Sequence, residues 1–236
     1  LPNTSGTSKL SPFIKHGQIH VETIWEECNK LKKTSVRKFL AEIGWREFNH
    51  SLINFFPHMI KRNYSKKFDQ FPWEKNDKHL NAWKKGLTGY PIVDAGMREL
   101  YSTGWMHNRV RMIVGSFLVK HLLINWTEGE SYFKNCLLDY NEANNISGWQ
   151  WVAGSGADAA PYFRIFNPIL QGEKFDKNGD YVKKWVPELK NVPKKFIHKP
   201  WELNDDNILK LGSDYPAPIV IHEQARSKAL SAFKSI

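Results

Sequence analysis

The sequence predicts an all-helical domain, and two observations carry that prediction. Apolar residues recur at the three- and four-residue spacing of amphipathic helices, whereas the alternating pattern of half-buried strands is scarce. At 236 residues the chain is long enough to bury a sizeable core. We therefore expect a single helical domain over residues 1–236.

The first long helix is expected over residues 35–56, where Pro57 ends it. One side of this helix is an apolar stripe that comprises Val36, Phe39, Leu40 and Ile43. Such a stripe is typical of a helix that packs against a core.

Further helices follow from the same spacing. One is expected over residues 89–102, with Pro91 in its first turn, and another over residues 106–125. Residues 139–156, rich in Asn, Gly and Ser around two tryptophans, are expected to form a loop. Beyond Pro187 we expect irregular segments and then a short last helix over residues 223–233.

Composition narrows the class of protein. The formal charge of +10 is typical of a protein that binds a polyanion such as nucleic acid, although a basic soluble protein is the alternative. Cys28 and Cys136 lie far apart and outside any metal-binding pattern, which predicts buried free thiols. With no signal peptide or membrane span, we expect an intracellular protein in a bacterial cytoplasm.

Two predicted helices carry polar faces that are unusual for a solvated surface. On the first, Glu42, Trp45, Arg46 and Asn49 share one face, which indicates either a ligand pocket or an exposed Trp beside an ion pair. On the third, Asn108 and Arg111 lie beside Met112, which could equally be core filler. Arg109 and Arg111 point in different directions, so one could pair with a buried carboxylate and the other with a phosphate.

Residues 7–11 precede Pro12 at the start of a predicted helix. Their hydroxyl and N–H groups could bind an anion, or they could form an ordinary helix cap.

Six motifs together resemble the class I photolyase and cryptochrome family across essentially the whole chain. They are Thr-Ser-Lys-Leu-Ser (7–11), Trp-Arg-Glu-Phe (45–48), Thr-Gly-Tyr-Pro-Ile-Val-Asp-Ala (88–95), Thr-Gly-Trp-Met-His-Asn-Arg-Val-Arg-Met (103–112), Gly-Trp-Gln-Trp (148–151) and Asp-Ala-Ala-Pro-Tyr-Phe-Arg-Ile-Phe-Asn-Pro (158–168). The resemblance implies the family's helical FAD-binding domain, whereas the family's N-terminal α/β antenna domain has no counterpart here.

The resemblance also implies a cofactor site. The residues that it assigns to FAD are Thr7, Ser8, Lys9, Leu10, Ser11, Arg46, Asn108, Arg111, Asp139, Tyr140, Asn141 and Asn145. Arg111 would pair with Asp139, and Asn145 would face flavin N5. Many members have Asp where Asn141 stands, so one flavin hydrogen bond is expected to differ. Trp149, Trp126 and Trp73 match the family's electron-transfer tryptophans, although three packed indoles are the structural alternative.

The activity that the resemblance implies is light-driven repair of cyclobutane pyrimidine dimers, with one electron passing from excited reduced FAD to the dimer. The catalytic pocket would contain Glu42, Trp45, Asn108, Met112 and Trp151. The residues expected to contact DNA are Glu42, Trp45, Arg46, Asn49, Asn108, Arg109, Trp151, Arg164, Gln171 and Lys174. Asn108 after His107 favours the dimer over the (6-4) photoproduct, whose repair enzymes have histidines in the pocket.

Three kinds of function remain open from the sequence. The first is this repair enzyme, expected to be a monomer whose partner is UV-damaged DNA. The second is a blue-light signalling flavoprotein of the cryptochrome type, and the third is a helical DNA-binding module without flavin.

Overall fold

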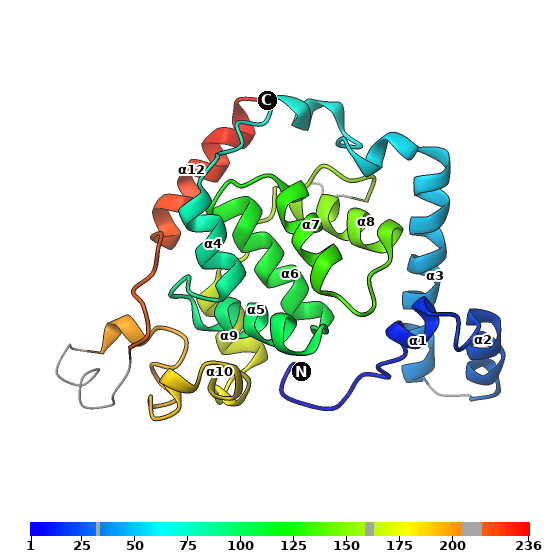
Figure 1. Ribbon diagram of the computed structural model, residues 1–236, viewed down its shortest axis with the longest axis horizontal. Helices are drawn as coiled ribbons and strands as arrows, with labels where there is room; N and C mark the ends of the chain where they lie inside the picture. Colours follow the sequence, from blue (N-terminus) through cyan, green and yellow to red (C-terminus); the bar gives the residue numbers. More distant parts are fainter. Residues whose placement is uncertain (32–33, 159–162, 204–213) are drawn as a thin grey trace.

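The computed structural model describes residues 1–31, 34–158, 163–203 and 214–236, and within them it is helical with no β-strand (Figure 1). The α-helices are α1 (Ser11–Lys15), α2 (Val21–Lys30), α3 (Thr34–Phe55), α4 (Asp77–Lys85), α5 (Pro91–Thr103), α6 (Asn108–Ser116), α7 (Trp126–Cys136), α8 (Glu142–Ala153), α9 (Pro168–Phe175), α10 (Asp180–Trp185) and α12 (His222–Lys234). The predicted helical fold class is therefore confirmed.

Short turns of other helix types connect these elements. They are η1 (Pro57–Ile60), η2 (Lys66–Gln70), η4 (Pro187–Leu189) and η5 (Pro200–Glu202), which are 3₁₀ turns, and η3 (Phe117–His121), which is a π-helical turn directly after α6.

The hydrophobic core lies where α5 packs against α6 and α10. Most side chains of α5 are buried, and Gly96 lets this helix approach α6 so closely that a Cβ there would lie 2.4 Å from Val110. A smaller cluster, formed by Phe68, Phe71, Phe163 and two alanines of α12, lies beneath that last helix. The central helices α5 and α6 thus have packing partners on several sides.

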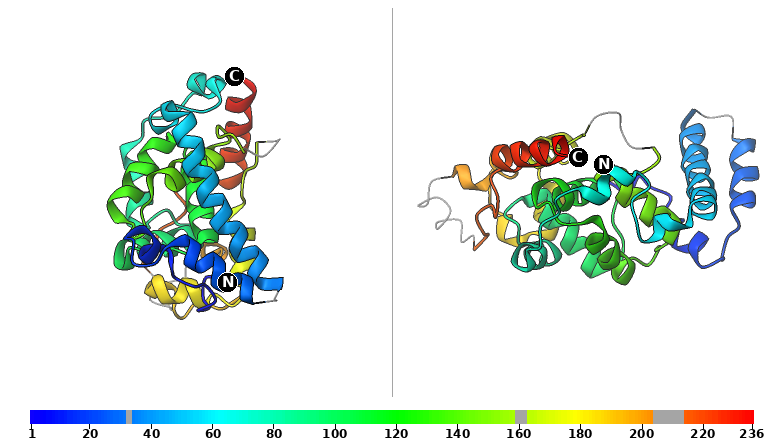
Figure 2. Two further views of the ribbon diagram at one scale, coloured as in Figure 1. Left: turned by 90° about the vertical axis from the view of Figure 1, so that its right-hand side faces the viewer. Right: turned by 90° about the horizontal axis from the view of Figure 1, so that it is seen from above.

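The N-terminal helices α2 and α3 stand at one side of this core, and α12 stands at the other (Figures 1 and 2). The long helix α3 contacts α8, η1 and α2. Ile43 and Leu52 are its buried apolar side chains, while Trp45, Phe48 and Phe55 are exposed.

Three expectations about local structure need correction. Residues 142–153 form helix α8 and not a loop, because Asn141 caps its start and Ala143, Ile146 and Trp149 are buried at helical spacing. The helix expected over 106–125 is α6, which begins at Asn108, followed by the π-turn, and it ends at His121. Cys28 and Cys136 are free, as expected, but half-buried.

The other expected helices are confirmed to within two residues at each end, as α3, α5 and α12. Among the described residues, no helix combines the length and the hydropathy that a membrane span requires.

Candidate functional site

A carboxylate between α7 and α8 joins three segments of the chain. Asp139 accepts hydrogen bonds from Arg111 Nη2 at 3.0 Å and 2.8 Å, and from Ser11 Oγ at 2.7 Å. Its side chain is only 4% exposed, so the guanidinium group compensates an otherwise costly buried charge. The predicted Arg111–Asp139 pair is confirmed, and it brings residues 7–11 to the end of α7.

The N-terminal segment that precedes Ser11 makes a second contact with the rest of the domain. Lys9, in a left-handed conformation with φ of 52°, places its ammonium group 5.6 Å from the centre of the Trp105 ring. The residue that caps α1 is Leu10, whose side chain forms no cap bond. Thr7 and Ser8 are exposed, and Ser8 Oγ accepts the backbone N–H of Leu10 at 3.4 Å.

Asn145 forms part of a small polar cluster with a glutamate that sequence reasoning missed. Its Nδ2 atom lies 3.2 Å from Glu130 Oε1, and the Tyr140 hydroxyl donates to the same oxygen at 3.0 Å. Burial, and then the Glu130 carboxylate, raise the pKa of Tyr140. Glu130 lies four residues after Trp126 on α7. This spacing, visible in the sequence, could have placed Glu130 on the same helix face as the matched Trp126.

Asn141 connects α8 to α3. Its Oδ1 atom accepts the backbone N–H of Asn144, so its Nδ2 atom faces His50 Nε2 at 3.0 Å. Asn49 adds a bond from its Nδ2 atom to Asn144 Oδ1 at 2.9 Å. Burial, and then Arg46, lower the pKa of His50, which favours the neutral ring that can accept from Asn141. The side chain of Asn49, expected at the DNA, is therefore engaged within the protein.

Of the remaining residues of the polar face of α3, Glu42 and Trp45 are exposed and Arg46 is half-buried. Trp45 is 48% exposed and packs edge-on against Phe48, and Glu42 is exposed. Arg46 donates to Glu47 Oε1 at 2.7 Å. An exposed indole beside an ion pair is what the surface alternative predicts, and an open pocket wall would look the same.

The three matched tryptophans differ in burial. Trp149 and Trp126, 3% and 1% exposed, both belong to the main core, whereas Trp73 is half-buried at its edge. Trp126 donates its indole N–H to Asn63 at 2.9 Å. Trp149 packs edge-on against Phe133 with 5.0 Å between ring centres, and its buried Nε1 atom has no partner in the part of the chain described.

Basic side chains gather beside α9. Arg109 and Lys174 approach the Phe175 ring at 4.6 Å and 5.5 Å from its centre. Burial, and then the charge of Arg164, lower the pKa of Arg109. We refer to Arg109, Lys174 and Arg164 as the basic patch. Gln171 lies one turn before Phe175 on the same helix. Residues 159–162 of the sixth motif lie outside the described residues.

Asn108 and Met112 lie on α6 next to this patch. Asn108 is exposed at the first position of the helix, and Met112 is half-buried against the main core. The core-filler alternative for Met112 therefore fits as well as a pocket floor does.

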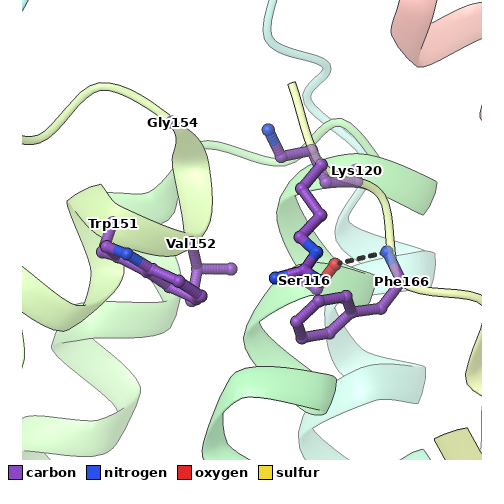
Figure 3. Close-up of a pocket in the computed structure, with 7 residues that line it drawn as sticks. Ser116, Lys120, Trp151, Val152, Gly154 and Phe166 are labelled. Atoms are coloured by element: carbon purple, nitrogen blue, oxygen red, sulfur yellow. Dashed lines mark hydrogen bonds between the residues drawn. The ribbon is translucent and has the colours of Figure 1, made fainter. Parts of the chain in front are cut away.

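Trp151 and Arg164 line a single small pocket of about 20 Å³ between α8 and η3. Figure 3 shows Trp151 and Val152 on one side of it, with Ser116, Lys120 and Phe166 across from them. The predicted lesion wall and a predicted DNA contact are thus neighbours.

Comparison with known proteins places the chain in a family. A family model described as the FAD binding domain of DNA photolyase matches residues 39–235. A deoxyribodipyrimidine photo-lyase from Agrobacterium fabrum is 50% identical to the chain, covering 100% of it and 51% of the relative.

Solved structures agree with this match. A bacterial class III photolyase from Agrobacterium tumefaciens superimposes with a TM-score of 0.95 at 49% identity, covering 100% of this chain and 50% of the other. An archaeal photolyase from Sulfolobus tokodaii, solved with two FAD molecules, gives 0.90 at 39% identity, covering 100% and 52%. The chain spans about half the length of these relatives. It therefore belongs to the FAD-binding domain family of DNA photolyases.

Proposed function

We propose that this chain binds FAD and repairs cyclobutane pyrimidine dimers in DNA under illumination, as a monomeric class I enzyme of the bacterial cytoplasm. The observation that carries the proposal is the convergence of residues 7–11, the Arg111–Asp139 pair and Asn145 around one region of the fold. The Agrobacterium tumefaciens structure is that of a class III photolyase. The assignment of this chain to class I is therefore part of what we propose.

The donor groups in this region fit FAD. Exposed hydroxyl and ammonium groups of Thr7, Ser8 and Lys9 suit a pyrophosphate, and the Asn145 amide can both donate to and accept from a flavin ring nitrogen. Arg111 and Asp139 hold the N-terminal segment beside α6 through Ser11. When bound, reduced and excited FAD supplies the single electron that opens the cyclobutane ring.

The residues of the chain would bind the lesion and stabilise its negative charge. Glu42 would hydrogen-bond to a dimer carbonyl, and Asn108 would bind a base edge. Trp45 and Trp151 would stack against the damaged bases, with Met112 beneath them.

The basic patch beside α9 would hold the DNA backbone. Arg109, Arg164, Lys174 and the amide of Gln171 would contact phosphates, which fixes register without reading sequence. The closeness of Arg164 to Trp151 supports one continuous surface for backbone and lesion. Because flipping a damaged base out of the duplex is least costly where pairing is already weakened, this surface would select dimers.

The experiment is a repair assay with purified, FAD-loaded and chemically reduced protein on thymine-dimer DNA, in light and in darkness. We expect light-dependent loss of dimers, and a rate at least about tenfold lower in Glu42→Ala, which corresponds to roughly 1.4 kcal/mol of lost transition-state stabilisation. Glu26→Ala, which removes an exposed glutamate from the neighbouring helix α2, is the matched control and should repair at the normal rate.

Two results would contradict the proposal. Flavin that photoreduces while dimers persist would favour the signalling alternative. Protein that retains no flavin after loading would favour the DNA-binding module.

A further inference from the structure

Lys120 is a buried cation that the proposed function leaves without a role. It lies in the π-turn η3 with 1% of its surface exposed. No ion pair joins it to a carboxylate of the described residues, and burial lowers the pKa of its ammonium group well below the usual value. Since burying an ammonium group without a counter-charge costs free energy, packing alone does not explain a lysine here.

The ammonium group has two partners, which come from different segments. It donates to the carbonyl oxygen of Ala153 at 2.7 Å, and it lies 2.9 Å from the centre of the Phe163 ring. Both partners present partial negative charge, the first as the last carbonyl of α8 and the second as an aromatic face. Lys120 thus connects the end of α8 to the segment that follows residue 162.

Local backbone structure gives the lysine this reach. The π-turn gives residues 117–121 a wider winding than an α-helix would, and such turns often occur at functional sites. Gly154, with φ of 89°, ends α8, and a Cβ there would lie 3.5 Å from Lys120 Nζ. That distance is an ordinary van der Waals contact, so the left-handed backbone, and not a lack of room, favours glycine here.

Each partner is close in sequence to a residue of the proposed DNA surface. Ala153 is two residues after Trp151, and Phe163 directly precedes Arg164. Trp151 lines the same pocket as Lys120 (Figure 3), and Arg164 also belongs to its lining. A hydrogen bond from the Phe166 backbone N–H to Ser116 Oγ at 3.4 Å also holds residues 163–166 against α6.

We propose that Lys120 is a positioning residue, which fixes the spacing between Trp151 and Arg164 and so sets the preference for damaged over undamaged DNA. The inference rests on the proposed function. A lesion flipped against Trp151 and a phosphate held by Arg164 belong to the same strand, so their spacing matters for damaged DNA. On an undamaged duplex the basic patch alone would bind, and that binding is insensitive to Trp151.

The test compares Lys120→Met with Lys190→Met, an exposed lysine whose loss removes the same charge. Dissociation constants are measured for a thymine-dimer duplex and an undamaged duplex, together with flavin content, thermal stability and the repair rate at saturating DNA. We expect the ratio of the two affinities to fall about tenfold in Lys120→Met, equivalent to roughly 1.4 kcal/mol. Flavin content and the repair rate at saturating DNA should stay unchanged, and Lys190→Met should keep the normal ratio.

An unchanged ratio in Lys120→Met, or an equal fall in Lys190→Met, would overturn the proposal. If Lys120→Met fails to fold, Phe163→Leu decides, since it removes the aromatic face and keeps an apolar side chain, and a normal ratio there would overturn the proposal too. Wild-type protein without any preference for the dimer would instead show that the proposed function has failed.

Discussion

The two sides of the candidate site differ in how much of their structure the protein itself fixes. On α8, Trp149 and Gln150 are 3% and 0% exposed, and Gln150 Nε2 donates to the carbonyl oxygens of Met59 and Arg62 at 2.9 Å and 3.0 Å. On α3, Trp45 is 48% exposed and Glu42 is also exposed. The central helices are therefore pre-organised, whereas this face of α3 is open to solvent.

The largest effect is expected from breaking the ion pair in the pre-organised half. Arg111→Leu would leave the Asp139 carboxylate buried, with Ser11 as its remaining side-chain donor among the described residues. We expect the free energy of unfolding to fall by about 3 kcal/mol, the cost typical of an unpaired buried charge. Urea denaturation measures this change, and a decrease below about 1 kcal/mol would show that the pair contributes no more than a surface ion pair does.

A slightly smaller effect is expected from the pH dependence of the central core. Asp94 is fully buried, and burial raises its pKa from 3.8 to about 6, although bonds from Thr88 and Tyr215 and the charge of Arg98 oppose the shift. Because the folded state holds this proton more tightly, its stabilising contribution is fully present below about pH 3.8 and is lost as the pH rises through about 6.

The measurement is the unfolding free energy of wild type minus that of Asp94→Asn, in which titrations shared by both proteins cancel. We expect this difference to move by about 2.4 kcal/mol in favour of wild type between pH 7 and pH 4. A difference that is the same at both pH values would mean that Asp94 titrates normally.

A third prediction compares two helical glycines, one in each half of the site. A Cβ at Gly129 would lie 2.1 Å from the Trp149 ring, whereas one at Gly44 on α3 would meet nothing within 4 Å. We expect Gly129→Ala to destabilise by about 2 kcal/mol through overpacking, and Gly44→Ala to stabilise by about 1 kcal/mol through helix propensity. Thermal unfolding measures the stability of both variants. Melting temperatures that shift in the same direction in both would contradict the comparison.

Much of the fold could be predicted because its helices carry apolar residues at regular three- and four-residue spacing. The periodic residues of α3 and α5 predicted both helices, and Pro91 and Gly104 marked the ends of α5. Helix α8 was missed because Asn144, Asn145, Ser147 and Gly148 have low helix propensity, while tertiary burial of Ile146 and Trp149 decides the outcome.

The candidate site was predictable only in part. The Arg111–Asp139 pair followed from the motifs, whereas the bonds from Asn145 to Glu130 and from Asn141 to His50 join residues 15 and 91 positions apart in the chain. The π-turn that carries Lys120 has no signal in hydrophobic spacing, since it differs from an α-helix by one inserted residue. Such long-range contacts require the folded structure.

Hydrogen–deuterium exchange of the full chain, with and without FAD and thymine-dimer DNA, tests the difference between the two halves most directly. We expect the amides of residues 42–49 to gain protection when both ligands bind, while those of α6 and α8 are protected from the start and change little. Equal protection of α3 before and after binding, or large changes confined to α6 and α8, would contradict a site whose central half is pre-organised and whose α3 half is completed by its ligands.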